Sequence, residues 1–550
     1  MGINLNIDGK EVFFDKKIKL SDITNGDKSI ICARVNNRTR DLDYIVDSDA
    51  NIKLLTLKSS SAMGIYENSI RYLFCMACHI LYPNLKFKLT YSVSRSIFAQ
   101  VLNKNRLINV NMVSSINEKM RELVEQDLPF ERLIVDKDKA LQMYKKFGMD
   151  DKAKVVKYRP EKSVHFYKCG DYYNYMFGRM VPSTGYLTKF ILRVYSPGLL
   201  ISYPRSELNG EIPPFKDEPT FSSALFDAQY WGNLVSMDSV SAINSSIKNT
   251  DAIETINICE NKQNRMLCEL GQRIEDRIDN IRLICIAGPS SSGKTTFSDR
   301  LVMELESRGI HPIRISLDDY YKTRENVPLG EDGTPDFEAI DALDIDQFNQ
   351  DIVDLLDEKT VTLPMFDFKT NRRIPGRTLK IGPKDPIVVE GIHALNEKTT
   401  SLIPKMLKFK IYISPQAQIN IDRENPISIT DIRLLRRIVR DFKYRNASAE
   451  ETFSMWPNVR KGEFKWIYNT QEDADYVFDS FLNYELCVLK KYAIPLLSKI
   501  EVENRYFPEA ERLIRLCKYF KEIDEKWIPC NSILREFIGG NCYRDGKVTK

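Results

Sequence analysis

The sequence predicts an α/β protein in which residues 281–500 form a domain around a parallel sheet. From Arg282 onward, short apolar runs alternate with segments of helical periodicity, the pattern of a parallel sheet covered by helices. The run LICIAG at 283–288 reads as a strand that leads into a glycine-rich turn and an amphipathic helix. By contrast, residues 1–57 alternate strand-like runs with turns, which indicates a small, mostly β unit ahead of this domain.

The chain has 550 residues, which is too long for one compact domain. We divide it into five parts, namely a β unit at 1–58, an α+β unit at 59–215, a connector at 216–280, the α/β domain at 281–500 and a helical tail at 501–550.

Helical periodicity marks two segments of the α+β unit. The first runs from 62 to 82 and stops at Pro83, and the second spans 114–126 and opens on a serine cap. Strand-like segments follow between 163 and 203. The tail reads as a helix, a proline break and a second helix.

Composition narrows the class of protein. The 80 basic and 76 acidic residues leave a net charge of +4, which does not favour a dedicated nucleic-acid or membrane binder. The N-terminus MGINLNIDGKEVFF has no apolar signal region, and Asn6 stands where a myristoylation motif needs serine or threonine. No apolar stretch is long enough to span a bilayer. We therefore expect a cytoplasmic protein without a membrane partner.

The stretch CMACH at 75–79 has the C-x-x-C-H pattern of a haem attachment site or half a zinc site. No haem is expected, because that attachment belongs to exported proteins. Zinc is not expected either, because the chain has no second CxxC pair. The 11 cysteines are interpreted as reduced thiols.

Residues 282–309 contain a phosphate-binding loop in a strand–loop–helix setting. Its glycines allow backbone N–H groups to turn toward phosphate oxygens, and the helix N-terminus adds a positive dipole end. Lys294 can reach the β- and γ-phosphates, and the Thr295 hydroxyl can bind Mg²⁺. The predicted nucleotide-binding residues are Gly288, Pro289, Ser290, Ser291, Ser292, Gly293, Lys294, Thr295 and Thr296.

Two later strands end in acids. PIRISLDDYYK at 312–322 delivers Asp318 and Asp319 to the carboxyl edge of the sheet, where open α/β sheets build their sites. A carboxylate there can accept a proton from an attacking hydroxyl or help to hold Mg²⁺. DPIVVEG at 385–391 ends in Glu390, which suits a role near Mg²⁺. An acidic turn or an ordinary strand-end acid is the alternative for these residues.

A row of arginines follows at 431–445. Arg433, Arg437 and Arg440 share one helix face, with Arg436 beside them and Arg445 beyond. Such a comb could close over a triphosphate and neutralise transition-state charge, although a charged solvent face is the alternative. Together the four segments point to nucleotide phosphates, Mg²⁺, a hydroxyl acceptor and a cationic lid, and so to a kinase rather than a motor or a switch GTPase.

The motifs GPSSSGKTT, LDDYY, DFEAIDALD, PMFDFKTNRR, VVEGIHAL and RLLRRIVRD occur in this order within 282–485. In this the chain resembles the uridine kinase / phosphoribulokinase family. The resemblance implies transfer of a phosphoryl group from ATP, with Mg²⁺, to a small-molecule hydroxyl. The residue roles that it implies are Asp318 as the base, Lys294, Arg437 and Arg440 as catalytic cations, Glu390 near Mg²⁺, and Tyr321, Glu338, Phe366, Asn371 and Arg445 at the acceptor.

The chain departs from that family at the positions that recognise the nucleobase. Phe366 and Asn371 replace a tyrosine and a histidine, and Met455 replaces a glutamine. Glu338 stands where uridine kinases have a ribose-binding aspartate. A pocket that loses hydrogen-bonding groups loses discrimination, so a non-nucleoside acceptor stays open beside a nucleoside.

The first half resembles two other families. Residues 1–57 are similar to a TGS domain, a β-grasp module. CMACHILYP, EQDLPFER, KCGDYYNYMFGRMVPSTG and FILRVYS resemble the editing domain of threonyl-tRNA synthetase. Its metal-type positions fall on Cys75, His79, Met176 and Met180, and only His79 keeps its identity. An editing hydrolase is therefore disfavoured. The alternative function is a nucleotide-regulated protein that binds RNA or tRNA, which the near-neutral net charge does not support. A homo-oligomer stays open as an expectation.

Overall fold

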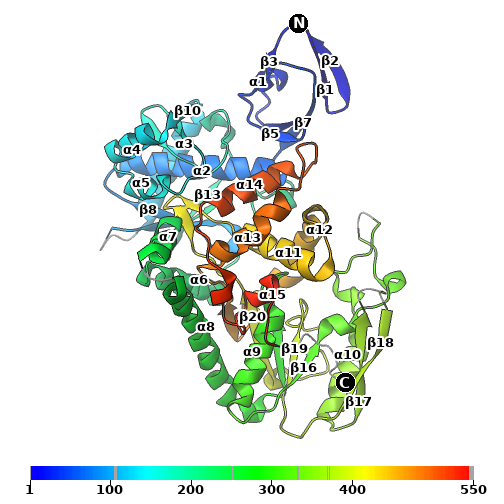
Figure 1. Ribbon diagram of the computed structural model, residues 1–550. Coiled ribbons are helices and arrows are strands. Elements are labelled where there is room, and N and C mark those ends of the chain that lie inside the picture. Colours follow the sequence, from blue (N-terminus) through cyan, green and yellow to red (C-terminus); the bar gives the residue numbers. More distant parts are fainter. Residues whose placement is uncertain are drawn as a thin grey trace.

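The computed structural model of the protein describes residues 2–103, 108–249, 252–330, 333–367, 370 and 372–543. Figure 1 shows a small N-terminal β unit at one end of the molecule and the parallel sheet of the C-terminal half at the other. Within the described residues, no helix is long and apolar enough to cross a membrane.

Residues 3–56 form a mixed five-stranded sheet in the order β2-β1-β7-β4-β5. Its central strands β1 and β7 are parallel, and its other neighbours are antiparallel. Alternate residues of β1, Ile3 and Leu5, point into a small core with Ala33 and Ile52. The elements are β1 (Ile3–Ile7), β2 (Lys10–Phe14), β3 (Ile18–Lys19), α1 (Leu20–Ile23), β4 (Ile30–Val35), β5 (Arg38–Arg40), β6 (Ile45–Val46) and β7 (Ala50–Thr56).

The next unit packs a long buried helix, α2 (Ser60–Leu81), into a core shared with a four-stranded antiparallel sheet, β13-β14-β9-β8. A three-stranded sheet, β10-β11-β12, lies beside it. Its remaining elements are β8 (Phe87–Tyr91), β9 (Ile97–Val101), α3 (Val110–Glu125), β10 (Glu131–Asp136), α4 (Lys137–Lys146), α5 (Asp150–Val156), β11 (Ser163–Cys169), β12 (Tyr172–Asn174), β13 (Ile191–Tyr195) and β14 (Gly198–Ser202).

Helix α3 begins earlier than predicted, because its cap is Asn109 and not a serine. The Asn109 side chain accepts a hydrogen bond of 2.9 Å from the N–H of Met112. Ser114 lies inside the helix, where its hydroxyl donates to Glu118 at 3.0 Å.

The connector between the halves consists of three helices, α6 (Pro219–Leu234), α7 (Val240–Asn249) and α8 (Ala252–Glu275). Ile256, Leu270 and Ile274 of α8 are buried in the same hydrophobic core as Phe297 and Leu301. The connector is thus part of the C-terminal core.

The C-terminal half is built on a parallel five-stranded sheet in the order β16-β19-β15-β20-β23. This confirms the predicted α/β class. Because all its strands run the same way, their carboxyl ends meet at one edge. The elements are β15 (Leu283–Ala287), α9 (Lys294–Glu306), β16 (Ile313–Ser316), α10 (Ile345–Leu356), β17 (Val361–Asp367), β18 (Arg372–Leu379), β19 (Ile387–Glu390), β20 (Lys408–Ser414), α11 (Ile429–Arg445), α12 (Ala449–Gly462), β23 (Tyr476–Asp479) and α13 (Glu485–Leu497).

A hairpin of β21 (Asn420–Asp422) and β22 (Asn425–Pro426) ties the two halves together. Lys152 of α5, which is 1% exposed on its side chain, forms ion pairs of 2.9 Å with both Asp422 and Glu424. Arg71 of α2 donates to the Glu424 carbonyl at 2.6 Å. Since α11 begins shortly after this hairpin, the N-terminal half holds the segment that leads into the arginine helix.

Candidate active site

The phosphate-binding loop, residues 288–293, joins β15 to α9. Gly288 has no room for a side chain, because a Cβ there would lie 2.0 Å from the carbonyl oxygen of Ile413. Ser291 and Gly293 both have positive φ, 60° and 91°. This backbone curls the loop into a concave turn of the kind that presents N–H groups to an anion. The N–H of Phe297 already donates to the Gly293 carbonyl at 3.0 Å, so the donors left for a ligand lie before it.

Three ionisable side chains converge beside this loop: Lys294, Asp318 and Glu390. Glu390 is 6% exposed, and burial, together with the neighbouring Asp318 charge, raises the pKa of its carboxyl to about 7. Burial also raises the pKa of Asp318, against the opposing effect of Lys294. The same burial lowers the pKa of Lys294, although both acids oppose it. The site is thus a desolvated cluster of two acids and one base at the carboxyl edge of the sheet.

Ser316 connects the two acids. Its hydroxyl donates to Glu390 at 3.0 Å and accepts from the N–H of Asp318 at 3.3 Å. By contrast, the Asp319 carboxylate accepts from the N–H of Phe366 at 3.3 Å and so supports the β17 strand. The sequence offered both aspartates, and the structure brings only Asp318 to Lys294.

The donors suited to Mg²⁺ at this edge are the exposed Thr295 hydroxyl and the carboxylates of Asp318 and Glu390. Mg²⁺ binds through one or two carboxylates plus phosphate oxygens and water, so this oxygen set fits the ion. A cation there would also offset the free-energy cost of ionising two neighbouring acids in a desolvated site. Within the described ranges, no group of three or more His, Cys, Asp or Glu residues could hold a metal by itself.

Two of the five arginines in the 431–445 row are buried, and they support the backbone of the loop instead of covering it. Arg433 and Arg436 are 1% and 0% exposed. Arg433 donates to the Ser290 carbonyl at 3.0 Å and Arg436 to the Ser291 carbonyl at 3.3 Å. Their charges are balanced by buried Glu463 and Glu485, respectively. The interpretation of the row as one mobile comb is therefore wrong for these two, because each is fixed beneath the loop by a buried ion pair.

The other three arginines lie near the Ser290 side chain or near Asp318. Arg437 donates to the Ser290 hydroxyl at 2.7 Å. Arg440 pairs with Asp441 at 2.7 Å, and the charges of Arg445 and Arg440 oppose the rise that burial causes in the pKa of Asp318. Repulsion from Arg440 lowers the pKa of Arg445 to about 10. A group of cations so close that they repel one another suits a polyanionic ligand.

The predicted acceptor residues form an aromatic corner next to Asp318. The ring of Tyr321, 8% exposed, lies 5.8 Å from Phe366 and 5.9 Å from Phe337. Burial raises the pKa of nearby Glu338 to about 7, against the opposing charge of Arg437. Asn371 lies outside the described residues, and Met455 is 41% exposed on α12.

The metal-type positions of the N-terminal half do not form a chelating set. Cys75, Met176 and Met180 are buried in one hydrophobic cluster. His79 is exposed and lies 5.2 Å from the ring of Tyr172. Burial raises the pKa of the Cys75 thiol, which keeps it protonated.

Sequence reasoning missed four residues of the site: Ser316, which links the two acids, Glu463 and Glu485, which pair with the buried arginines, and Glu536 of the tail. The N–H of Thr296 donates to the Glu536 carboxylate at 3.0 Å across 240 residues of sequence. No local pattern could have paired residues this far apart.

Known proteins resemble the part of the chain that carries this site. The model of the phosphoribulokinase / uridine kinase family matches residues 283–486. A uridine kinase of Staphylococcus haemolyticus is 33% identical over 199 residues, which are 36% of this chain and 87% of that protein. A uridine kinase of Staphylococcus carnosus is 32% identical over 196 residues, 36% of this chain and 85% of that protein.

Solved structures match more distantly. A possible uridine kinase from Bacillus stearothermophilus has 20% identity and a TM-score of 0.25, over 38% of this chain and 100% of that one. A D-glycerate 3-kinase from Cryptococcus neoformans has 14% identity and a TM-score of 0.22, over 48% of this chain and 89% of that one.

Proposed function

Because the chain belongs to the phosphoribulokinase / uridine kinase family, it is an ATP-dependent phosphotransferase, and we propose that its acceptor is the hydroxyl of a nucleoside. The observation that carries the proposal is the meeting of Lys294, Asp318 and Glu390 beside the loop. Uridine is the first acceptor to test, since the relatives with 33% and 32% identity are uridine kinases.

In the proposed reaction, the loop amides hold the phosphates of ATP, and Lys294 swings from the Gly288 carbonyl, 3.0 Å away, onto them. Arg437 and Arg440 neutralise charge that develops on the transferred group. Asp318 accepts the proton of the acceptor hydroxyl while the oxygen of that hydroxyl bonds to the γ-phosphorus. ADP then leaves with the electrons of the broken P–O bond.

Thr295 and Glu390 are the residues that we propose to hold Mg²⁺, with Glu390 acting directly or through water. The ion would neutralise charge on the phosphate oxygens when bound. Glu390 must be ionised for this role, which the cation itself favours.

We propose that the acceptor lies against Tyr321 and Phe366, whose ring faces suit a planar base. Glu338 accepts hydrogen bonds from the sugar hydroxyls of the nucleoside, and Arg445 completes the described part of the site. With Met455 on the solvent side of α12, the pocket has few groups that tell one base from another. A broad nucleoside range, or a non-nucleoside hydroxyl acceptor, is therefore the alternative outcome of the test.

The test is a phosphorylation assay with Mg-ATP against a panel of nucleosides, sugars and sugar phosphates. Turnover of uridine or another nucleoside that Asp318→Asn abolishes supports the proposal. Turnover of a sugar or sugar phosphate alone would contradict the acceptor and keep the phosphotransfer chemistry. A parallel comparison of ATP with GTP gives the preferred donor.

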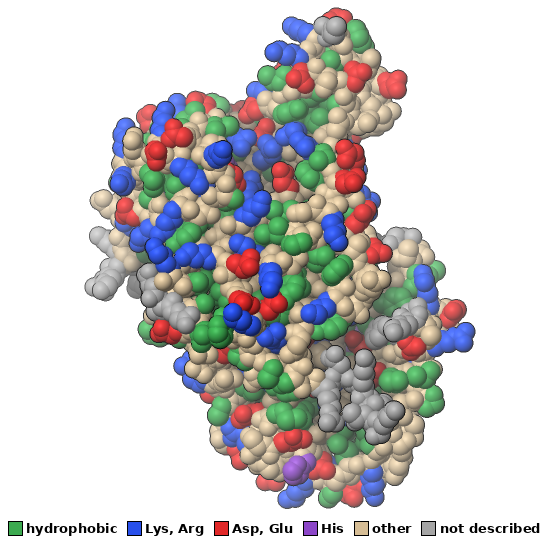
Figure 2. Space-filling view, viewed as in Figure 1, with side chains coloured by type: hydrophobic (Ala, Val, Ile, Leu, Met, Phe, Trp, Pro, Cys, Tyr) green, Lys and Arg blue, Asp and Glu red, His purple; other side chains and the backbone are tan. Residues whose placement is uncertain are grey.

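For the N-terminal half, we propose a TGS-like β-grasp unit at 1–58 and a unit like the editing domain of threonyl-tRNA synthetase at 59–215, with the chain acting in the cytoplasm. The central parallel pair of β1 and β7 supports the first assignment. On the face shown in Figure 2, basic and acidic side chains are interspersed, which does not favour a role on RNA. RNA filter binding across a salt series tests that role, because phosphate contacts give a steep salt dependence.

A further inference from the structure

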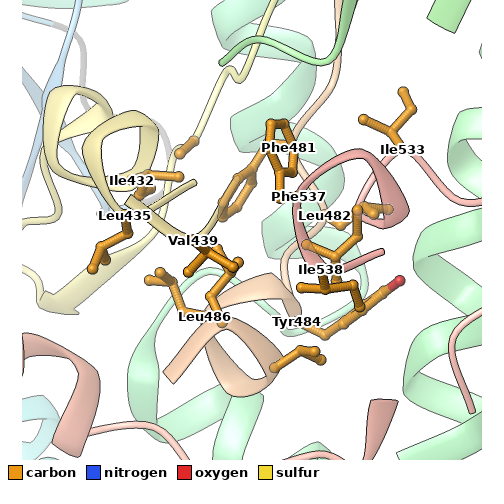
Figure 3. Packing of buried hydrophobic residues seen from close by; sticks show 14 of the residues in the cluster. Ile432, Leu435, Val439, Phe481, Leu482, Tyr484, Leu486, Ile533, Phe537 and Ile538 are labelled. Atoms are coloured by element: carbon orange, nitrogen blue, oxygen red, sulfur yellow. The ribbon is translucent and has the colours of Figure 1, made fainter. Parts of the chain in front are cut away.

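The C-terminal segment after α14 (Phe507–Lys518) reaches the phosphate-binding loop and the start of α9. Its short helix, α15 (Arg535–Ile538), packs beside α11, and Figure 3 shows Phe537 and Ile538 among Val439, Leu482 and Leu486. Ile533, Leu534, Phe537 and Ile538 are each 0–1% exposed. The segment is therefore part of the hydrophobic core, and these buried side chains hold it in place.

Polar side chains on the same segment reach the first turn of α9. Glu536 accepts from the N–H of Thr296 at 3.0 Å, and the Asn541 amide donates to the Thr296 hydroxyl at 3.0 Å. A methyl group of Ile533 lies against the last glycine of the loop, so close that a Cβ on Gly293 would meet it at 2.5 Å. Glu536 also adds negative charge near Lys294.

The Thr296 N–H is one of the donors that have no partner within the helix and that a P-loop offers to phosphate oxygens. A carboxylate oxygen on this donor has the charge and hydrogen-bonding character of a phosphate oxygen. ATP and Glu536 cannot both accept a full hydrogen bond from the Thr296 N–H, because one donor makes one strong hydrogen bond.

We propose that Glu536 is an internal competitor of the nucleotide, and this rests on the loop being the ATP site. ATP binding requires the Glu536 side chain to rotate away from Thr296. Glu536 is only half-buried, whereas Arg535 anchors the backbone by donating to the Ile528 and Glu525 carbonyls at 2.6 and 2.8 Å. The side chain can therefore move while the segment stays, so the tail lowers ATP affinity without leaving the site.

The test is calorimetric titration of the full chain with Mg-ATP. Glu536→Ala is expected to bind ATP about tenfold more tightly than the wild type, the value of one hydrogen bond to a charged group. Glu536→Gln, which keeps the shape and the capping oxygen, is expected to show a smaller gain in the same direction. Glu522→Gln removes an equal charge from an exposed site on the same tail and is expected to leave ATP binding unchanged.

Equal or weaker ATP binding by both Glu536 variants, including no binding by any protein, overturns the proposal. Weaker binding would mean that Glu536 supports the nucleotide site. A gain in affinity shared by Glu522→Gln would overturn it as well, since the effect would then be general electrostatics. Tighter ATP binding without phosphorylation of any nucleoside would contradict the proposed acceptor while supporting the role of Glu536.

Discussion

The hydroxyl of Ser316 donates a hydrogen bond of 3.0 Å to Glu390. These residues end β16 and β19, two neighbouring parallel strands, and the same hydroxyl accepts from the N–H of Asp318. One small side chain thus sets the position of the proposed base relative to the proposed Mg²⁺ residue. The arrangement lets the fold hold two acids near one another through a neutral hydroxyl group.

Asp318→Asn is expected to lower kcat by about 10²–10⁴-fold, the usual contribution of a general base. ATP binding should persist, because the loop donors are unchanged. The matched control is Asp319→Asn, whose side-chain oxygen can still accept from the Phe366 N–H. Steady-state kinetics of both variants check this, and equal losses in the two would contradict the assignment of the base.

Arg440→Met and Arg436→Met are expected to fail in different ways. Arg436 pairs with fully buried Glu485, so its loss should cost about 3–5 kcal/mol of stability. Arg440 is partly exposed near Asp318, and its loss should lower kcat by about 10²-fold with little change in melting temperature. Thermal unfolding and kinetics on each variant separate the two roles. A stable but inactive Arg436→Met protein would show that this arginine acts on the ligand.

The pH dependence of stability should carry the signature of Glu338. Its pKa is raised by burial to about 7 in the folded protein, so its contribution to stability is full at low pH and is lost as pH rises through 7. Glu338→Gln should flatten this part of the pH profile of the ligand-free protein. Acceptor binding should change in the opposite sense, because the ionised carboxylate is the better hydrogen-bond acceptor. Melting temperature and acceptor KM between pH 5.5 and 8 measure both effects.

Lys152→Met should destabilise the protein by about 3–5 kcal/mol, because it leaves the buried carboxylate of Asp422 and the half-buried carboxylate of Glu424 without their cation. Lys154→Met is the control, since it removes an exposed lysine from the same helix. Urea unfolding gives the comparison. A matching shift of the midpoint in both variants would show that this clamp between the halves contributes little.

Local patterns predicted the part of the site that is local. The loop, its helix and the strand-end acids lie within short stretches whose glycine spacing and apolar runs dictate their structure, and the family match covers 283–486. Adjacent Asp318 and Asp319 could not be told apart from the sequence, because their directions depend on the turn after β16 and on Phe366.

The sequence patterns could not show which distant residues pair with the site. Glu463 and Glu485 lie 30 and 49 residues from the arginines that they balance, so those arginines looked free to move. Glu536 lies 240 residues from Thr296, and the tail motif SILREFIGG has no pattern that points to the loop. The assignments of residues 1–215 to the TGS and synthetase families stay predictions.

The proposed phosphotransfer is tested most directly by following radiolabelled γ-phosphate from ATP to uridine and other nucleosides, with the wild type and with Lys294→Ala. We expect a labelled nucleoside monophosphate with the wild type and loss of that product with Lys294→Ala, while the variant keeps the wild-type melting temperature. Equal product from both proteins would contradict the proposed site. Label on no nucleoside, with turnover of another hydroxyl compound, would contradict the proposed acceptor.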